Sequence, residues 1–514
     1  MKKLVSLLLA MIMLMSAFSF AIAEEPYKIS VICTFYGENT PDIDNSPAWQ
    51  KVEELTNTDW DITWVAPGDA AQKFNTVMAS TDQPMIYVIP SGATTNANYI
   101  DMCQSGIFWD LTDYIQNSDL FRTELSSPAA LNATSIDGCN YMFPLISSAT
   151  RLGLIYRQDW IENLAAKGIE VKVPTNIEEF KIMVEAFATQ DPDGNGINDT
   201  IGFAYCDDDD EELDYAGFNL IQAMTGGPVG WGFTEDDKLM PYFFFDEYFE
   251  TLDVFKWMYE NQYMNTDFAI NTDKHAPLAN NWSGSMCTSA TGATSNDYDN
   301  LNSIVGEGKW FIEAQQVFYT PEGKRVTSST MTPGSLDGLL ISKIAVPTEE
   351  ELVKLLNLFE TMLAADSEIA KVMSLGIEGV HYVIGENGYP SSTEEQQKAW
   401  ANERNNVMTN MLPRRIVGLD FGGEKTEKQI RNQKILNMNE ENEQYAVVDA
   451  STPYMTTDLR NAQYQIATII SDARVKYMVG QIDKAGFVAE TERWLAEGGQ
   501  EIVDAVNAAY QASK

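Results

Sequence analysis

Basic residues are scarce in this sequence. Its 514 residues include 34 lysines and arginines against 75 aspartates and glutamates, which gives a formal net charge of −41 at pH 7. A field of that sign repels phosphate backbones and anionic membrane surfaces. The composition therefore excludes nucleic acid as a partner, and it disfavours a strongly anionic ligand unless local basic residues override it. It favours a cation such as calcium.

Histidine and cysteine are also rare. The two histidines, His275 and His381, stand alone, and no H-E-x-x-H, G-x-S-x-G, Walker A or dinucleotide-binding motif occurs. A histidine-based nucleophilic enzyme is therefore not expected, although a glycosidase pair of carboxylates could hide among 75 acids. The five cysteines lack C-x-x-C spacing, which favours buried free thiols and leaves one disulfide open.

Long hydrophobic runs are missing after residue 23. The first 23 residues differ: two lysines precede an apolar stretch that ends in Ala21-Ile22-Ala23, the small-x-small pattern of a signal peptidase site. We predict that residues 1–23 are a signal peptide. An uncleaved anchor is the competing interpretation, because residues 4–23 are about long enough to cross a bilayer. The mature chain is expected to be exported and soluble, in the periplasm or at the cell surface.

Short β-branched runs alternate with helical patterns in the first 120 residues. This alternation is typical of an α/β domain with a parallel sheet and crossover helices. The strand patterns cover 27–36, 59–67 and 85–92, and the helical patterns between them cover 46–58 and 71–80.

Two later helix starts carry the spacing of a capping box, Thr175 with Glu178 and Thr348 with Glu351. The helix after Thr348 places four leucines, a phenylalanine and a methionine on one face, which is typical of a helix packed on a core.

The segment DPDGNGINDTIGF at 191–203 has the first nine positions of a calcium loop. Oxygen donors at alternating positions suit that ion, and Gly196 permits the sharp turn. Position twelve, which usually holds a bidentate Glu, is Gly202. We therefore predict one structural calcium site between a helix and a strand, with a metal-free turn as the alternative. The predicted ligands are Asp191, Asp193, Asn195, the Ile197 carbonyl and Asp199.

Aromatic side chains are plentiful, with 11 tryptophans, 22 tyrosines and 23 phenylalanines. Sugar sites combine flat aromatic platforms with a few convergent polar groups. Trp231 lies in a glycine-rich segment and Trp282 in a polar segment of small residues, and Trp49, the weaker candidate, follows the polar stretch 37–48. We predict that these rings stack on a ligand, and ordinary packing is the equal alternative for each.

Five segments resemble one family when taken in order. They are MASTDQP at 78–84, IYRQDW at 155–160, the stretch 174–202 that contains the loop, SLGIEGVHY at 374–382 and the C-terminal stretch 494–510. Together they resemble extracellular solute-binding proteins (family 1) of carbohydrate ABC transporters, of the type with an internal calcium loop. Met85 departs from the family, which usually has Asp after the proline at 84.

The resemblance implies an α/β fold of two lobes with type II periplasmic-binding-protein topology. Each lobe would be a mostly parallel sheet flanked by helices, with a hinge that bends when a ligand stabilises the closed state. We expect residues 24–150 to begin lobe 1, which about 285–345 completes. Residues 151–284 would begin lobe 2, which about 346–514 completes.

The resemblance also implies a function: a monomeric, non-enzymatic protein that captures an oligosaccharide and delivers it to an ABC transporter permease. Tyr156 and Arg157 are expected to contact the ligand near the lobe junction, unless Arg157 pairs with Asp159 instead. A secreted carbohydrate-active hydrolase or lyase and a peptide-binding or sensory protein are the alternatives. Relatives are often tethered by a lipid on a cysteine after the signal peptide, where this chain has Glu24.

Overall fold

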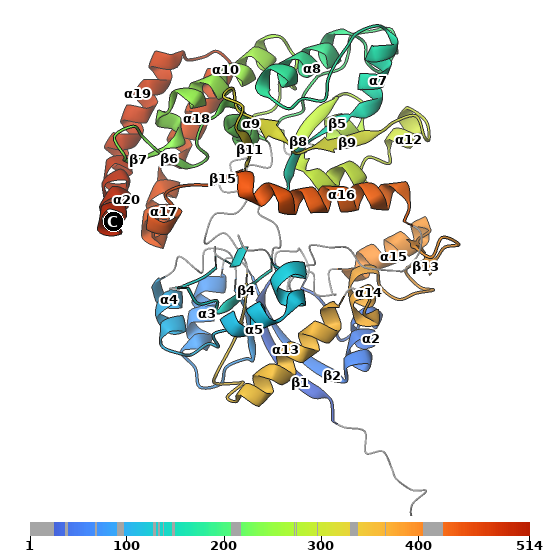
Figure 1. The fold of residues 1–514 in the computed structure, drawn as a ribbon, viewed down its shortest axis with the longest axis vertical. Helices are drawn as coiled ribbons and strands as arrows, with labels where there is room; N and C mark the ends of the chain where they lie inside the picture. The colour runs from blue at the N-terminus through green and yellow to red at the C-terminus, as the bar shows by residue number, and fades with distance from the viewer. Residues whose placement is uncertain are drawn as a thin grey trace, which may run out of the picture.

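The protein consists of two lobes that lie one above the other, and α16 runs along the side of the second lobe that faces the first (Figure 1). This architecture confirms the two-lobed α/β prediction. The computed structural model describes residues 25–35, 40–66, 69–89, 97–126, 130–131, 134–136, 138–145, 150–206, 217–271, 273, 275–295, 297–328, 338–364, 366–404 and 425–514. The predicted signal peptide lies outside these residues.

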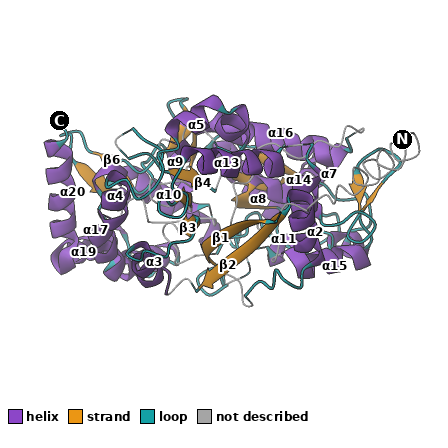
Figure 2. Ribbon diagram, turned by 90° about the horizontal axis from the view of Figure 1, so that it is seen from below, coloured by secondary structure: helices purple, strands orange, loops and turns teal. Residues whose placement is uncertain are grey.

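The first lobe is built on a five-stranded sheet in the order β2-β1-β3-β12-β4. β1 pairs in parallel with β2 and β3, as the alternating pattern predicts, and Figure 2 shows β1 and β2 side by side. β12 is antiparallel to both of its neighbours. The strands are β1 Tyr27–Thr34, β2 Thr58–Val65, β3 Ile86–Ile89, β4 Met142–Pro144 and β12 Gly338–Ile341, and a separate hairpin joins β13 Val383–Ile384 to β14 Pro390–Ser391.

Helices cover this sheet with apolar faces. The capping box at Thr348 is confirmed, and the predicted stripe of α13 is buried. Its side chains join those of β1, β3 and β12 in one core. The helices are α2 Pro47–Thr56, α3 Ala70–Met78, α4 Ala97–Gln104, α5 Thr112–Asn117, the π-helix η3 Leu120–Glu124, α13 Glu349–Leu363, α14 Glu368–Leu375 and α15 Glu394–Arg404.

The second lobe has a central sheet in the order β8-β5-β9 in which both pairs are antiparallel, so its strand directions differ from the mostly parallel sheet expected. Parallel bridges of residues 201–204 add to its edge at β8. The strands of the lobe are β5 Leu152–Arg157, β8 Ser285–Ser289, β9 Ile312–Gln315, the pair β6 Trp231–Phe233 and β7 Leu239–Pro241, and the group β10 Phe318–Tyr319, β11 Arg325–Ser328 and β15 Ala446–Val447.

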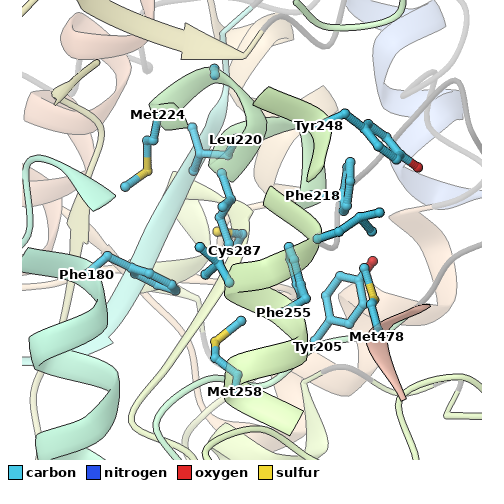
Figure 3. Close-up of a cluster of buried hydrophobic side chains, with 14 of the residues drawn as sticks. Phe180, Tyr205, Phe218, Leu220, Met224, Tyr248, Phe255, Met258, Cys287 and Met478 are labelled. Carbon is cyan, nitrogen blue, oxygen red and sulfur yellow. The ribbon is translucent and has the colours of Figure 1, made fainter. Parts of the chain in front are cut away.

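An aromatic core holds the second lobe together. The rings of Phe218 and Phe255 stack at 5.5 Å, and Tyr205 lies 4.6 Å from Phe255, with Cys287 beside them (Figure 3). The helices are α7 Gln158–Ala166, α8 Ile177–Thr189, α9 Phe218–Thr225, α10 Asp246–Glu260, α11 Ala276–Ala279, α12 Leu301–Ile304, α16 Glu427–Asn442, α17 Thr457–Gln465, α18 Ala467–Met478, α19 Lys484–Trp494 and α20 Gln500–Ala512, with short helices η4 Tyr242–Phe244, η5 Ala290–Thr294, η6 Glu443–Tyr445, η7 Thr452–Tyr454 and η8 Leu495–Gly499.

The segments that complete each lobe differ from those expected. Residues 285–328 belong to the second lobe, because β8 and β9 pair with β5. Residues 346–404 belong to the first lobe, because α13 and α14 pack into its core. Only 425–514 joins the second lobe as expected. The reason is that β-pairing chooses between two sheets through long-range contacts, which no local pattern encodes.

Two smaller predictions can be compared with the structure. The first capping box is displaced by one residue: Asn176 caps α8 through the Glu179 amide, and the Glu179 carboxylate accepts from Thr175. The five cysteines form no disulfide with one another, and all but the half-buried Cys139 are buried. No described helix is long and apolar enough to cross a membrane.

Candidate metal-binding loop and inter-lobe surface

The loop after α8 turns its polar side chains toward one another. The backbone of Asp191 has φ of +48° and that of Gly196 has φ of +90°, a conformation that glycine adopts without strain. Asp191 Oδ1 accepts from the Gly196 amide at 3.2 Å, and Asn195 Oδ1 accepts from the Ile197 amide at 2.8 Å. The Asn195 side-chain amide donates to Asp193 at 3.1 Å and to Asp199 at 3.0 Å. The predicted ligands therefore meet in one loop.

The electrostatics of the loop fit a cation. Burial raises the pKa of Asp193, and the nearby carboxylates of Asp199 and Asp191 raise it further. The pKa of Asp191 is lowered, chiefly because the Lys167 ammonium donates to its carboxylate at 3.1 Å. Among the described residues no three His, Cys, Asp or Glu side chains are grouped tightly enough to hold a metal ion. Asn195 and backbone carbonyls would therefore have to supply part of the donor set, and rotation of its amide presents the oxygen in place of the nitrogen.

The loop is fastened to its surroundings on both sides. On α7, Lys167 contacts the Asp191 carbonyl and Asn163 donates to the Pro192 carbonyl at 3.0 Å. After the loop, the Thr200 hydroxyl donates to the carbonyl of Phe187 in the last turn of α8 at 2.7 Å. The loop thus connects α7 and α8 through its own backbone.

Arg157 is a structural residue. Its guanidinium binds both oxygens of Asp159, at 2.8 and 2.6 Å, and donates to Asn281 Oδ1 at 2.6 Å. The Asn281 amide in turn donates to Asp193 of the loop at 3.1 Å. Arg157 is only 1 % exposed. The pairing with Asp159 that the sequence left as the alternative is confirmed.

Tyr156 and Arg157 lie at the end of β5 away from the point where the chain enters the second lobe, and their contact with a ligand stays a prediction. β4 lies in the first lobe, so the chain enters the second lobe at the Leu152 end of β5. At about 3.3 Å per residue, Arg157 lies about 17 Å further along the strand. Tyr156 is buried beside it, and this burial raises its pKa. We call the Leu152 end the inner end of β5 and the Arg157 end its outer end.

The three tryptophans have three different environments. Trp49 is 0 % exposed and meets Trp60 edge-on at 5.6 Å in the first-lobe core, so its ring has no free face for stacking. Trp282 is 59 % exposed, but its carbonyl accepts from Ile201 directly after the loop, which places it at the outer end. Trp231 is 2 % exposed and belongs to the second-lobe core, with its indole N–H 3.3 Å from Gln463 Oε1.

Several residues near Trp231 were missed by the sequence analysis, because no motif marks them. Tyr464 on α17 is 57 % exposed, and Val448, which follows β15, is 54 % exposed. α17 and β15 lie on the side of the second lobe that faces the first (Figure 1). Between them, Asp449 accepts from the amide and hydroxyl of Ser451, each at 2.7 Å. Burial is the main cause that raises the pKa of Asp449 to about 6.

A pocket of about 400 Å³ lies elsewhere, between α5 and α13 of the first lobe. Two of its three carboxylates already have partners: Tyr114 donates to Glu349 at 3.0 Å and Ser118 donates to Glu360 at 2.5 Å. The pocket is not between the lobes and contains none of the predicted ligand residues.

This two-lobed arrangement agrees with comparisons to known proteins. A model of the bacterial extracellular solute-binding protein family matches residues 38–312, which is more than half of the chain. The protein therefore belongs to that family of solute-binding proteins.

Individual relatives extend over nearly the whole chain. The polygalacturonan/rhamnogalacturonan-binding protein YtcQ of Bacillus subtilis is 28% identical over 491 residues, which cover 95% of this chain and 92% of YtcQ. The crystal structure of an extracellular solute-binding protein from Bifidobacterium longum subsp. infantis superposes with a TM-score of 0.65 at 16% identity, covering 95% of this chain and 98% of that one. An EF-hand mutant of the Streptococcus pneumoniae ABC-transporter substrate-binding protein FusA, in complex with fructo-nystose, has a TM-score of 0.56 at 17% identity and covers 95% and 100%. Both of these solved structures are similar in fold to this protein.

Proposed function

We propose that this exported protein captures an oligosaccharide between its lobes, as a monomer, and delivers it unchanged to the membrane permease of an ABC transporter. Membership of the extracellular solute-binding family carries the proposal. The names of relatives support the ligand class: YtcQ is named for two polysaccharides, and the FusA mutant is described in complex with fructo-nystose.

The inter-lobe side of the second lobe has suitable chemistry. An exposed aromatic ring such as Tyr464 can stack on the apolar face of a sugar, and Gln463 and Asp449 offer polar groups close to Trp231. We propose that this surface, including the edge of the Trp231 ring, is the part of the ligand site that the second lobe contributes. Trp49, Tyr156, Arg157 and Trp282 have packing or outer-end positions and are not included.

A thermal-shift screen tests the proposal. The chain is heated with oligogalacturonides, rhamnogalacturonan fragments, fructo-oligosaccharides and short peptides, because a ligand that binds only the folded state raises the melting temperature. We expect one glycan class to give a saturable shift and to be recovered intact by mass spectrometry. Cleavage of the glycan would support a hydrolase or lyase instead, and a shift with peptides alone would support a peptide-binding or sensory protein.

We also propose that the 191–199 loop binds one calcium ion. Asp191, Asp193, Asn195, the Ile197 carbonyl and Asp199 would hold it, and the ion would neutralise the clustered carboxylates. The convergent side chains and the mutual effect of these aspartates on the pKa of Asp193 support a cation here. The EF-hand named in the FusA structure is a parallel in a protein of the same fold.

A further inference from the structure

Three chain connections run between the lobes. The chain passes from β4 to β5, from β11 to β12 and from α15 to α16, and each of these pairs has one element in each lobe. In the second lobe, Thr150 comes just before β5, Arg325 begins β11, and the third connection enters α16 at Glu427, the end of the helix opposite to Asn442.

Hydrogen bonds between polar groups link three elements of the second lobe: the start of β5, β11 and the end of α16. The Thr150 hydroxyl donates to the carbonyl of Asn439 on α16 at 2.5 Å. The Gln316 amide donates to Asn439 Oδ1, and the Gln316 carbonyl accepts from the Asn442 side chain at 2.8 Å. Asn442 Oδ1 then accepts from the Arg325 guanidinium at 2.7 Å. The chain of hydrogen bonds therefore runs without a break from Thr150 to Arg325.

The burial of this network is unusual for a helix face. Three side chains of α16 are buried, and two of them, Asn439 and Asn442, are amides where apolar residues would be expected. Thr150 and Gln316 are buried as well. Buried amides are tolerated only when they are hydrogen-bonded, and a fully satisfied network favours one arrangement of its elements. An apolar helix face could slide along its neighbours, whereas these hydrogen bonds fix the position of α16 along its axis.

Arg325, at the β11 end of the network, is itself held by further contacts. Its guanidinium lies 4.2 Å from the ring of Tyr445 and binds Glu441 at 2.8 Å. Two residues after Arg325 on β11, Thr327 pairs with Ala446 of β15. The strand that leaves the lobe and the helix that enters it are thus joined at several points.

We propose that Thr150, Gln316, Asn439, Asn442 and Arg325 form a hinge anchor, a single unit that couples the start of β5, β11 and the end of α16, so that the three second-lobe elements adjoining the inter-lobe connections move together. The anchor contains no ligand-contacting group. Its bearing on solute capture rests on the proposed function, because the anchor would then ensure that closure displaces the lobes as two bodies.

Hydrogen exchange of the ligand-free full-length chain tests the anchor independently of any ligand. Asn439→Leu keeps the volume and removes the central acceptor. We expect about fivefold faster exchange, the factor for loss of one hydrogen bond, in three separate places: the start of β5, β11 and the last turn of α16. Asn432→Leu is the matched control, because Asn432 is on the same helix and accepts from Thr294 of η5 at 2.9 Å, outside the network that joins Thr150 to Arg325.

The second variant, Thr150→Val, removes one hydroxyl at the far end of the network from β11. We expect it also to speed exchange in β11, which it does not touch. Faster exchange confined to the neighbours of each substituted residue would overturn the proposal, even if glycan binding is intact. Failure of every glycan to bind the unaltered chain would overturn the proposed function and leave the exchange result unaffected.

Discussion

The two ends of β5 are stabilised by different chemistry. At the outer end, Arg157 is surrounded by Asp159, Asn281 and, one bond further, Asp193 of the loop. At the inner end, Thr150 begins a network made mostly of neutral amides. One strand of six residues therefore separates a cluster built on a buried ion pair from a network of neutral amides that ends in the half-buried Arg325.

The difference follows from what each end does. A buried ion pair is strongly destabilised when one partner is removed, so it suits a part of the lobe that stays rigid. Neutral hydrogen bonds contribute about 1 kcal/mol each, fix register by geometry and leave no uncompensated charge when they are strained. The charged end can also hold a cation, whereas the neutral end lies where the lobes are connected.

Arg157→Met gives the largest expected effect. It leaves the Asp159 carboxylate, whose side chain is only 13% exposed, without its cation, and removing one partner of a buried pair costs about 3–5 kcal/mol. Urea unfolding of the variant measures the loss in unfolding free energy. Arg157→Lys is the control: it keeps the charge but not the fork of donors, so we expect an intermediate value. A loss below about 1 kcal/mol would mean that the outer end is not held by charge.

Calcium should strengthen the outer end. Binding to the folded state at 100 times the dissociation constant contributes about 2.7 kcal/mol, and a chelator removes this contribution. Scanning calorimetry with calcium and with chelator measures the change in melting temperature. In Asp193→Asn, which keeps the size of the side chain, we expect little response to calcium. Equal responses of the variant and the unaltered chain would place the ion elsewhere.

The outer end could be largely predicted from sequence, because its information is local. The residues from Asp191 to Asp199 are consecutive, and Arg157 is two residues from Asp159. The alternation of the first 90 residues similarly predicted β1, α2, β2, α3 and β3, whose neighbours are close in the chain.

The inner end could not be predicted, because its partners are far apart. Thr150 and Asn439 are separated by 289 positions, and Gln316 and Asn439 by 123. Nothing in the sequence around Asn439 distinguishes a buried amide from a solvated one. The same lack of local information misplaced residues 285–328 and 346–404, and it made the buried Trp49 look like a loop residue.

The ionisation of Asp449 shows how well the inter-lobe side of the second lobe tolerates a negative charge. Its pKa rises from 3.8 to about 6 on folding, so at intermediate pH the folded state holds a proton that the unfolded state lacks. The unfolding free energy should therefore fall as pH rises from about 4 to 7, by roughly 2 kcal/mol after allowance for partial exposure. Asp449→Asn should remove this slope. Urea titrations of both proteins at four pH values measure it, and parallel curves would contradict the assignment.

The smallest expected effect is on two threonines, Thr150 and Thr200. Each donates a hydrogen bond to a helix carbonyl, one at the inner end of β5 and one near its outer end. Thr150 donates to a carbonyl in the last turn of α16, and Thr200 donates to one in the last turn of α8. Helix carbonyls there have no partner within the helix. Replacing either threonine by valine should cost about 1 kcal/mol of unfolding free energy, and serine should restore most of it.

Unfolding free energies alone therefore do not distinguish the two threonines. Hydrogen exchange in segments distant from each substitution does distinguish them. Thr200→Val changes a contact between α8 and the loop that follows it, so its faster hydrogen exchange should stay within those two segments. Thr150→Val changes the first link of the hinge anchor, so exchange should also rise in β11. If Thr200→Val had the same effect on β11, the second lobe would loosen as a whole, and the distinction between a rigid outer end and a coupled inner end would be lost.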